Sequence, residues 1–155
     1  MKKSIWGIFV IAAVLAAVSS APLSGQGNVT KEKSLYSRLG GKKAIVAVVD
    51  EFVSRVAADT RINAFFAATA ADPARLKAFK GKLVDQICMA SGGPCKYAGK
   101  NMKAAHAGMG VNGADFDALV GDLVGALDKL KVGPHEKDQL LGVLGPMKTD
   151  IVEKK

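Results

Sequence analysis

The sequence lacks the patterns of several common protein classes. No stretch alternates apolar and polar residues as a half-buried strand does, and no segment repeats at a fixed period. No Ser-His-Asp order, phosphate-binding glycine loop or paired-carboxylate site supports hydrolase or transferase chemistry. The missing strand pattern argues against a sheet-rich fold and favours an all-α domain.

Aromatic residues are also scarce, at 6% of the chain, while lysine and arginine outnumber aspartate and glutamate by 22 to 14. The lysines are spread along the whole chain, and few aromatic side chains are present to stack on bases, so the composition argues against a nucleic-acid groove. The formal net charge of +8 suits instead an acidic redox partner or an anionic membrane surface.

The first 21 residues have the pattern of a secretory signal peptide. Lys2 and Lys3 precede an apolar run of 14 residues, Ile5–Val18, and the small residues 19–21 follow it. This run is shorter than the roughly 20 residues that span a bilayer. We therefore predict export to the periplasm, with an uncleaved membrane anchor as the alternative because Pro22 is a poor first residue of a mature chain. Cleavage removes two lysines and no acidic residue, so the net charge falls from +8 to +6.

After the signal peptide, residues 22–33 are polar and without apolar periodicity, and we predict a flexible leader. Residues 34–155 are then one domain, large enough to bury a core. Apolar residues at steps of three and four predict helices over 43–58, 73–89, 114–131 and 134–152, with a short helical turn around Phe65. Gly121 and Gly125 lie inside the third of these and are predicted to mark close helix approach.

One of only two histidines, His106, lies in a short segment bounded by turns. Glycine-containing turns at 92–94, 99 and 108–110 break the backbone on both sides of the helix-permissive residues 101–107. A helix of about two turns is marginal in water on its own. Something must therefore stabilise this helix, either ordinary packing or the binding of the imidazole to a buried metal or cofactor. The spacing alone does not decide between these two interpretations.

Several blocks of the sequence resemble the truncated haemoglobins, the short bacterial globins, and most of all their first group. Gly-Gly-Pro at 92–94 is followed by Tyr97-x-Gly99, then by Met102, and by His106 with Ala-Gly-Met-Gly-Val after it. Leu-Tyr-Ser-Arg-Leu-Gly-Gly at 35–41 and Leu-Gly-Pro-Met at 144–147 stand in matching order. The resemblance implies a two-over-two helical sandwich around haem.

In that family the residue matching His106 is the proximal ligand of the haem iron, so the resemblance makes His106 the metal ligand. Neutral imidazole is a good axial ligand, and its other ring nitrogen normally donates to a backbone carbonyl or to water. Met102 lies four residues earlier on the same helical face, where it can pack on the macrocycle. Tyr97 belongs to the same cofactor-binding segment. No Cys-x-x-Cys-His occurs, so we expect non-covalent haem b.

On the distal side, the resemblance places Phe52, Val53 and Phe66 at the cofactor. Members of the first group usually have Phe-Tyr where this chain has Phe52-Val53, and the Tyr hydroxyl donates a hydrogen bond to bound oxygen. Val53 cannot donate. A net hydrogen bond of about 1–1.5 kcal/mol corresponds to roughly tenfold in affinity. Weaker retention of oxygen is therefore expected unless another side chain donates.

Two registers remain open for the distal helix. Counting forward from residues 75–76 places Leu76 and Lys80 over the iron. Counting back from the turn at 92–94 places there Phe79, Lys82 and Leu83. The second count is favoured because a helix end at Gly-Gly is a better anchor than a loop. Lys82 or Gln86 is then a candidate for the missing donor, and a solvent-facing role is the alternative for each.

The two cysteines, Cys88 and Cys95, flank the turn at 92–94. In an exported protein a disulfide between them is expected, with two free thiols as the alternative. On the chain-entropy model this bond is worth roughly 2.5 kcal/mol. It would pin the end of the distal helix to the segment that leads to His106.

The activity that the resemblance implies is reversible binding of a diatomic gas (oxygen, nitric oxide or carbon monoxide) at the haem iron. An enzymatic alternative is a nitric oxide dioxygenase or a peroxidase-like haem protein, which needs an external electron donor because the chain has no reductase domain. A third alternative, without haem, is a helical binding module in which His106 is an ordinary core residue.

Overall fold

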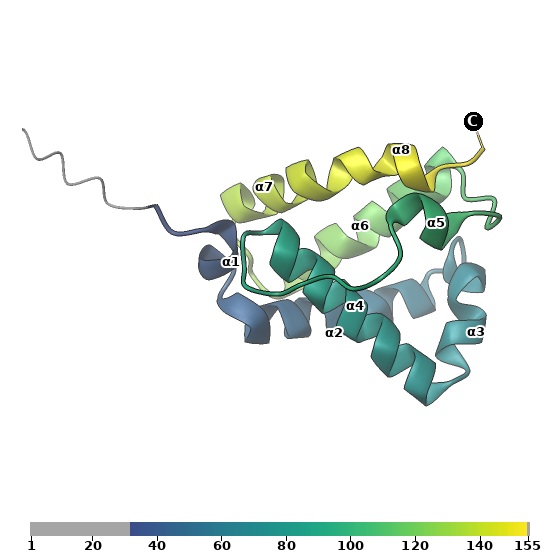
Figure 1. Ribbon diagram of the computed structural model, residues 1–155, viewed down its shortest axis with the longest axis horizontal. Coiled ribbons are helices and arrows are strands. Elements are labelled where there is room, and N and C mark those ends of the chain that lie inside the picture. The colour runs from purple at the N-terminus through teal and green to yellow at the C-terminus, as the bar shows by residue number, and fades with distance from the viewer. Residues whose placement is uncertain (1–31, 155) are drawn as a thin grey trace, which may run out of the picture. The chain divides into compact units, whose positions relative to one another are not determined.

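The computed structural model describes residues 32–154 (Figure 1). The predicted signal peptide, 1–21, lies outside the described residues, as does the predicted leader apart from Glu32 and Lys33, which are exposed and precede the first helix. Among the residues that are described, no helix is long and apolar enough to cross a membrane.

Helices supply nearly all the regular structure of residues 32–154. In chain order the elements are α1 (Leu35–Arg38), α2 (Gly41–Ala58), the 3-10 turn η1 (Asn63–Phe66), α3 (Ala67–Ala70), α4 (Pro73–Ala90), α5 (Met102–His106), α6 (Gly113–Lys129), α7 (Pro134–Leu144), the 3-10 turn η2 (Gly145–Met147) and α8 (Lys148–Ile151). Within this part of the chain the only strand-type pairing is an isolated bridge between Asn112 and Lys154. The prediction of an all-α domain is confirmed.

Helices α4 and α6 begin at side-chain caps. At α4 the Asp72 carboxylate accepts from the backbone N–H groups of Ala74 (2.9 Å) and Arg75 (3.1 Å), and Pro73 takes the first helical position. At α6, Asn112 and Asp115 form a reciprocal capping box. These local signals place the start of both helices within one residue of the prediction.

The predicted final helix over 134–152 is interrupted. Helix α7 ends at Leu144, η2 follows without a loop, and α8 ends at Ile151. Pro146 lies in η2 and has no backbone N–H to donate to a carbonyl four residues earlier. The chain therefore stays helical in path, but its hydrogen bonding changes at this residue.

The prediction for the two glycines of α6 is wrong for Gly121 and right only in part for Gly125. A Cβ at Gly121 would meet no atom within 4 Å. At Gly125 a Cβ would lie 2.5 Å from a guanidinium nitrogen of Arg55. The close neighbour is thus a side chain from α2 rather than a second helix backbone.

The main core lies between α2, α4 and α6, with α7 packed against it. Its fully buried side chains include Ile45, Val49, Ile62, Leu127 and Leu140. A second cluster, built on Val111, Phe116 and Ile151, takes in side chains that pack against it from several elements, among them Phe65, Met102 and Met147. Since Met102 begins α5, this second cluster is the apolar support of the helix that carries His106.

Candidate functional site

His106 is the last residue of α5 and is half-buried. Its Nδ1 lies 2.7 Å from the carbonyl oxygen of Met102. A carbonyl only accepts, so Nδ1 carries the hydrogen and donates it. In the neutral ring the lone pair is then on Nε2, which is the tautomer that a metal-ligating imidazole requires.

None of the five residues of helix α5 is fully buried, so the packing of Met102 on the second cluster is supplemented by contacts at both ends of the helix. At its start, the Asn101 side chain accepts from the backbone N–H of Ala104 at 2.8 Å. Beyond its end, the carboxylate of Glu153 accepts from the backbone N–H groups of Gly108 and Gly110. Helix α5 lies beside α8 (Figure 1), so the chain's C-terminal segment reaches the turn that follows His106.

Tyr97 closes the turn ahead of α5. Its hydroxyl donates to the carbonyl oxygen of Lys100 at 2.9 Å. The ring covers Gly99, where a Cβ would lie 2.2 Å from the phenolic oxygen. Only glycine fits under this ring, and the Tyr97-x-Gly99 pattern thus has a packing reason as well as a place next to the His106 segment.

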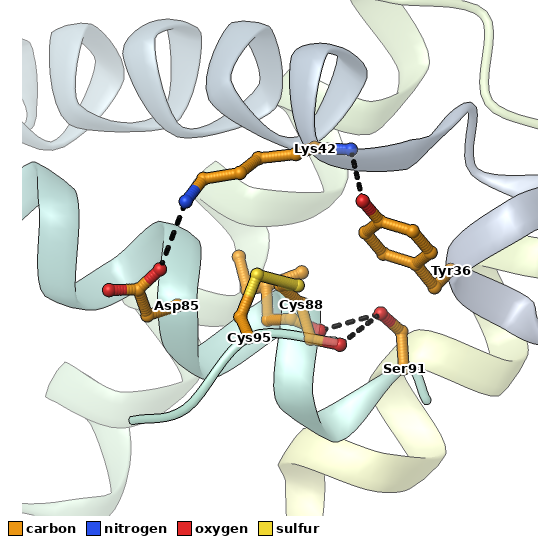
Figure 2. The surroundings of a disulfide bond; sticks show 7 residues. Tyr36, Lys42, Asp85, Cys88, Ser91 and Cys95 are labelled. Atoms are coloured by element: carbon orange, nitrogen blue, oxygen red, sulfur yellow. Dashed lines mark hydrogen bonds and ion pairs between the residues drawn. A yellow bond between two sulfur atoms is a disulfide. The ribbon is translucent and has the colours of Figure 1, made fainter. Parts of the chain in front are cut away.

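A disulfide joins Cys88, in the last turn of α4, to Cys95, with a Cα–Cα distance of 5.7 Å (Figure 2). The Ser91 hydroxyl donates to the carbonyl oxygens of Ile87 (2.7 Å) and Cys88 (3.2 Å), which holds the turn at the helix end. A Cβ at Gly93 would lie 2.7 Å from Cys88 Sγ. The end of α4 is in this way fastened to the segment that leads to α5.

A cavity of about 310 Å³ lies between α2, η1, α3 and α4. Four residues predicted for the distal side line it together: Phe52, Val53, Phe66 and Phe79. The rings of Phe66 and Phe79 are 5.7 Å apart. Leu76 and small side chains complete an apolar lining, with Asn63 and Thr69 as its polar members. His106, Met102 and Tyr97 are not part of this lining.

The remaining candidates of the distal helix lie elsewhere. Leu83 is half-buried against the main core, and Lys82 is exposed. Lys80 Nζ pairs with Asp50 Oδ1 of α2 at 2.8 Å. Gln86 Nε2 donates to Met147 Sδ at 3.3 Å, and Gln86 Oε1 is buried with no hydrogen-bond partner.

The carboxylate of Asp122 lacks a full set of hydrogen-bond partners. Oδ2 of Asp122, in α6, is buried and has no hydrogen-bond partner. Burial raises the pKa of Asp122, and the negative charge of Asp59 raises it further. The pKa of Asp59 is itself lowered by its hydrogen bonds with Arg61, whose guanidinium lies 2.6 Å away.

Comparison with known proteins decides the family. The model of the family described as "Bacterial-like globin" matches residues 34–153. The group 1 truncated hemoglobin GlbN of Mycolicibacterium paratuberculosis is 35% identical over 118 residues, covering 76% of this chain and 83% of that protein. The chain belongs to the group 1 truncated haemoglobins.

Solved structures of truncated haemoglobins agree with the fold. The Fe(III) form of the truncated hemoglobin from Tetrahymena pyriformis superposes with a TM-score of 0.71 at 31% identity, covering 79% of this chain and all of that one. The 2/2 hemoglobin from Synechococcus sp. PCC 7002, with covalently attached heme, gives the same TM-score, identity and coverage. The predicted two-over-two helical fold is confirmed.

Membership of this globin family implies a haem cofactor and a gas as the ligand. The residues of this truncated haemoglobin fit that cofactor. The half-buried imidazole of His106 keeps the Nε2 lone pair available for iron. The aromatic and aliphatic lining around Phe52, Phe66 and Phe79 suits the apolar macrocycle and its gas ligand.

Sequence reasoning missed two contacts of this truncated haemoglobin, the Glu153 carboxylate on Gly108 and Gly110 and the Gln86–Met147 pair. The Gly108-x-Gly110 pattern signals a turn, and both glycines have positive φ, 79° and 69°. No spacing rule, however, links that turn to an acid more than 40 residues away.

Proposed function

We propose that this truncated haemoglobin binds haem b non-covalently through Nε2 of His106 and reversibly binds a diatomic gas on the opposite side. The observation that carries the proposal is the hydrogen bond from His106 Nδ1 to the Met102 carbonyl oxygen, 2.7 Å long. It fixes the ring orientation and leaves Nε2 as the only ring nitrogen with a lone pair. When bound, the haem iron supplies the position that a gas ligand occupies.

Different residues of the chain act on the proximal and on the distal side of the haem. Met102 supports the proximal side through its carbonyl oxygen and through its packing on the second cluster. Phe52, Phe66 and Phe79 keep water away from the distal side, because their lining is apolar.

We propose that oxygen is held without the hydrogen bond that a distal tyrosine gives. Val53 lines the cavity where that hydroxyl would stand. The Asn63 amide, a polar member of the lining, donates to the carbonyl oxygen of Ala57 at 3.4 Å. Gln86 donates to a sulfur. These contacts support weak retention of oxygen relative to relatives with a distal donor.

For the distal helix we propose the register counted back from the turn at 92–94. Phe79, which this register places over the iron, lines the cavity, whereas Leu83 packs against the main core. Phe79 packs on Phe66. Lys80, which the other register places there, is paired with Asp50 on α2. Leu76, which the other register places over the iron, also lines the cavity. Lys82 is exposed, so we assign it a solvent-facing role rather than that of a distal hydrogen-bond donor.

The test is the absorption spectrum of the purified domain after titration with haem, in the ferric form, after reduction, and with carbon monoxide. A Soret band that shifts on reduction and again with carbon monoxide is expected, and His106→Ala is expected to abolish stable haem uptake while helical content remains. Acidified butanone should extract the haem completely, because attachment is non-covalent. No haem band in the wild-type chain would favour the helical module without haem.

A nitric oxide dioxygenase or peroxidase-like activity is separated from gas carriage by turnover. Such an enzyme consumes its ligand only when an external electron donor is supplied. The net charge of +6 on the chain after residue 21 supports an acidic protein as that donor. Nitric oxide consumption that continues over many turnovers with a reductant present would establish the enzyme, and a single stoichiometric binding step would establish the carrier.

We also propose that the protein is exported, with residues 1–21 removed. The Cys88–Cys95 disulfide supports an oxidising compartment, where such bonds persist. Fractionation of cells that express the full chain should recover it in the periplasm, and its intact mass should lack the first 21 residues. Recovery of the uncleaved chain with membranes would favour the anchor instead.

A further inference from the structure

We infer that Glu153 is a positioning residue for His106. Its carboxylate clamps the turn that follows His106 and so fixes the direction in which the imidazole presents Nε2. The inference rests on the proposed role of His106 as the haem ligand.

Both carboxylate oxygens of Glu153 are engaged by the turn. Oε1 accepts from the backbone N–H of Gly108 at 2.7 Å, and Oε2 accepts from that of Gly110 at 2.6 Å. Both glycines have positive φ, a conformation that glycine adopts without strain and that turns both N–H groups toward one anion. Hydrogen bonds to an ionised acceptor are stronger than neutral ones, so this pair of bonds fixes the turn firmly.

The backbone around Glu153 is itself held in place. The backbone N–H groups of Glu153 and Lys154 both donate to the Val111 carbonyl oxygen, at 2.8 and 3.2 Å. Two residues earlier, Ile151 is buried in the second cluster together with Val111. The end of the chain is therefore anchored by packing and by backbone bonds before its carboxylate reaches the turn.

The clamp matters because α5 has little else to hold its C-terminal end. None of its residues is buried, and Ala107, which follows His106, leaves the helix in an extended conformation. The Asn101 cap acts only at the other end. The two N–H bonds also lower the pKa of Glu153, which keeps the carboxylate ionised at neutral pH.

The test compares three variants of the haem-loaded full domain: Glu153→Ala, Glu153→Gln and, as matched control, Asp150→Ala, which removes an exposed acid from α8. Haem dissociation to excess acceptor globin and the iron–histidine stretching band of the reduced protein are measured for each. Loss of a partner that orients a metal ligand typically costs 10–100-fold in affinity. We expect dissociation about tenfold faster and a displaced band for Glu153→Ala, intermediate behaviour for Glu153→Gln, which keeps one carbonyl acceptor, and wild-type behaviour for Asp150→Ala.

A second readout needs no haem. In the haem-free protein, hydrogen exchange at the Gly108 and Gly110 amides should quicken in Glu153→Ala and stay unchanged in Asp150→Ala. If Glu153→Ala does not fold, Glu153→Gln carries the comparison.

Each failure has its own signature. Wild-type haem affinity and an undisplaced band in the Glu153 variants, with faster amide exchange, would show that Glu153 braces the turn without orienting His106, and would overturn the inference. A wild-type protein that takes up no haem would overturn the proposed function itself, before any variant is compared.

Discussion

The wall of the distal cavity and the segment that carries His106 differ in what holds them. Of the residues that line the cavity, Phe52 of α2 is 7% exposed and belongs to the main core, and Val53 and Phe66 pack against that core from α2 and η1. Helix α5 has no buried residue. Apart from the packing of Met102 on the second cluster, its place is set by the Asn101 cap, the Glu153 carboxylate and the disulfide ahead of it.

The difference predicts how each side responds to change. Apolar packing tolerates volume-conserving substitution, because its energy is spread over many weak contacts. A hydrogen bond or a disulfide depends on particular atoms, and deleting one of them removes the whole interaction. The distal wall should therefore accept new side chains that fit its cavity, whereas the proximal segment should be sensitive to single-atom changes.

The largest effect is expected from breaking the covalent tie on the proximal side. The double variant Cys88→Ala/Cys95→Ala should lose roughly 2.5 kcal/mol of unfolding free energy, because its unfolded chain is no longer constrained by the cross-link. Denaturant unfolding measures the loss, and wild type in strong reductant is the matched control. Hydrogen exchange should quicken over residues 91–101 and not in α2. An unchanged midpoint would mean that packing alone holds this segment.

An intermediate effect is expected from adding a donor to the distal wall. Val53→Tyr should slow oxygen dissociation about tenfold, because its hydroxyl can donate to bound oxygen and the cavity of about 310 Å³ has room for the ring. Val53→Phe controls for ring volume without the hydroxyl, and stopped-flow oxygen release is the measurement. Equal rates for the tyrosine and phenylalanine variants would place residue 53 away from the gas ligand.

The smallest effect is expected at the unpartnered carboxylate of α6. The pKa of Asp122 is raised above its ordinary 3.8 in the folded state, so stability is lost as pH rises from 3.8 through that raised value. Asp122→Asn should gain about 1 kcal/mol at pH 7, and the gain should shrink as pH falls toward 4. Denaturant unfolding at several pH values measures it. A variant less stable than wild type at pH 7 would show that the charge is well accommodated.

Much of the fold was predictable because its signals are local. Apolar steps of three and four placed α2, α4 and α6 within two residues of their observed ends. The break at Pro146 was missed, since the apolar pattern continues across it while the hydrogen bonding does not. The close helix approach predicted at Gly121 was wrong, because a glycine within a helical pattern does not show whether another helix packs against that position.

The candidate site was predictable in its residues more than in its contacts. The family resemblance supplied His106, Met102 and the phenylalanines, and four of the distal residues line one cavity. The Glu153 clamp depends on how the end of the chain folds back past α8, which no local pattern encodes. The polar members of the lining, Asn63 and Thr69, come from η1 and α3, which carry no amphipathic signal of their own.

The proposed function depends on the binding of the haem iron by Nε2 of His106. Its most direct test is the spectrum of His106→Gly loaded with haem, recorded reduced and with carbon monoxide, without and with free imidazole. We expect the variant to lose stable haem and its wild-type bands, and imidazole to restore both by filling the space left by the side chain. A variant that keeps the wild-type spectrum without imidazole would contradict the proposal.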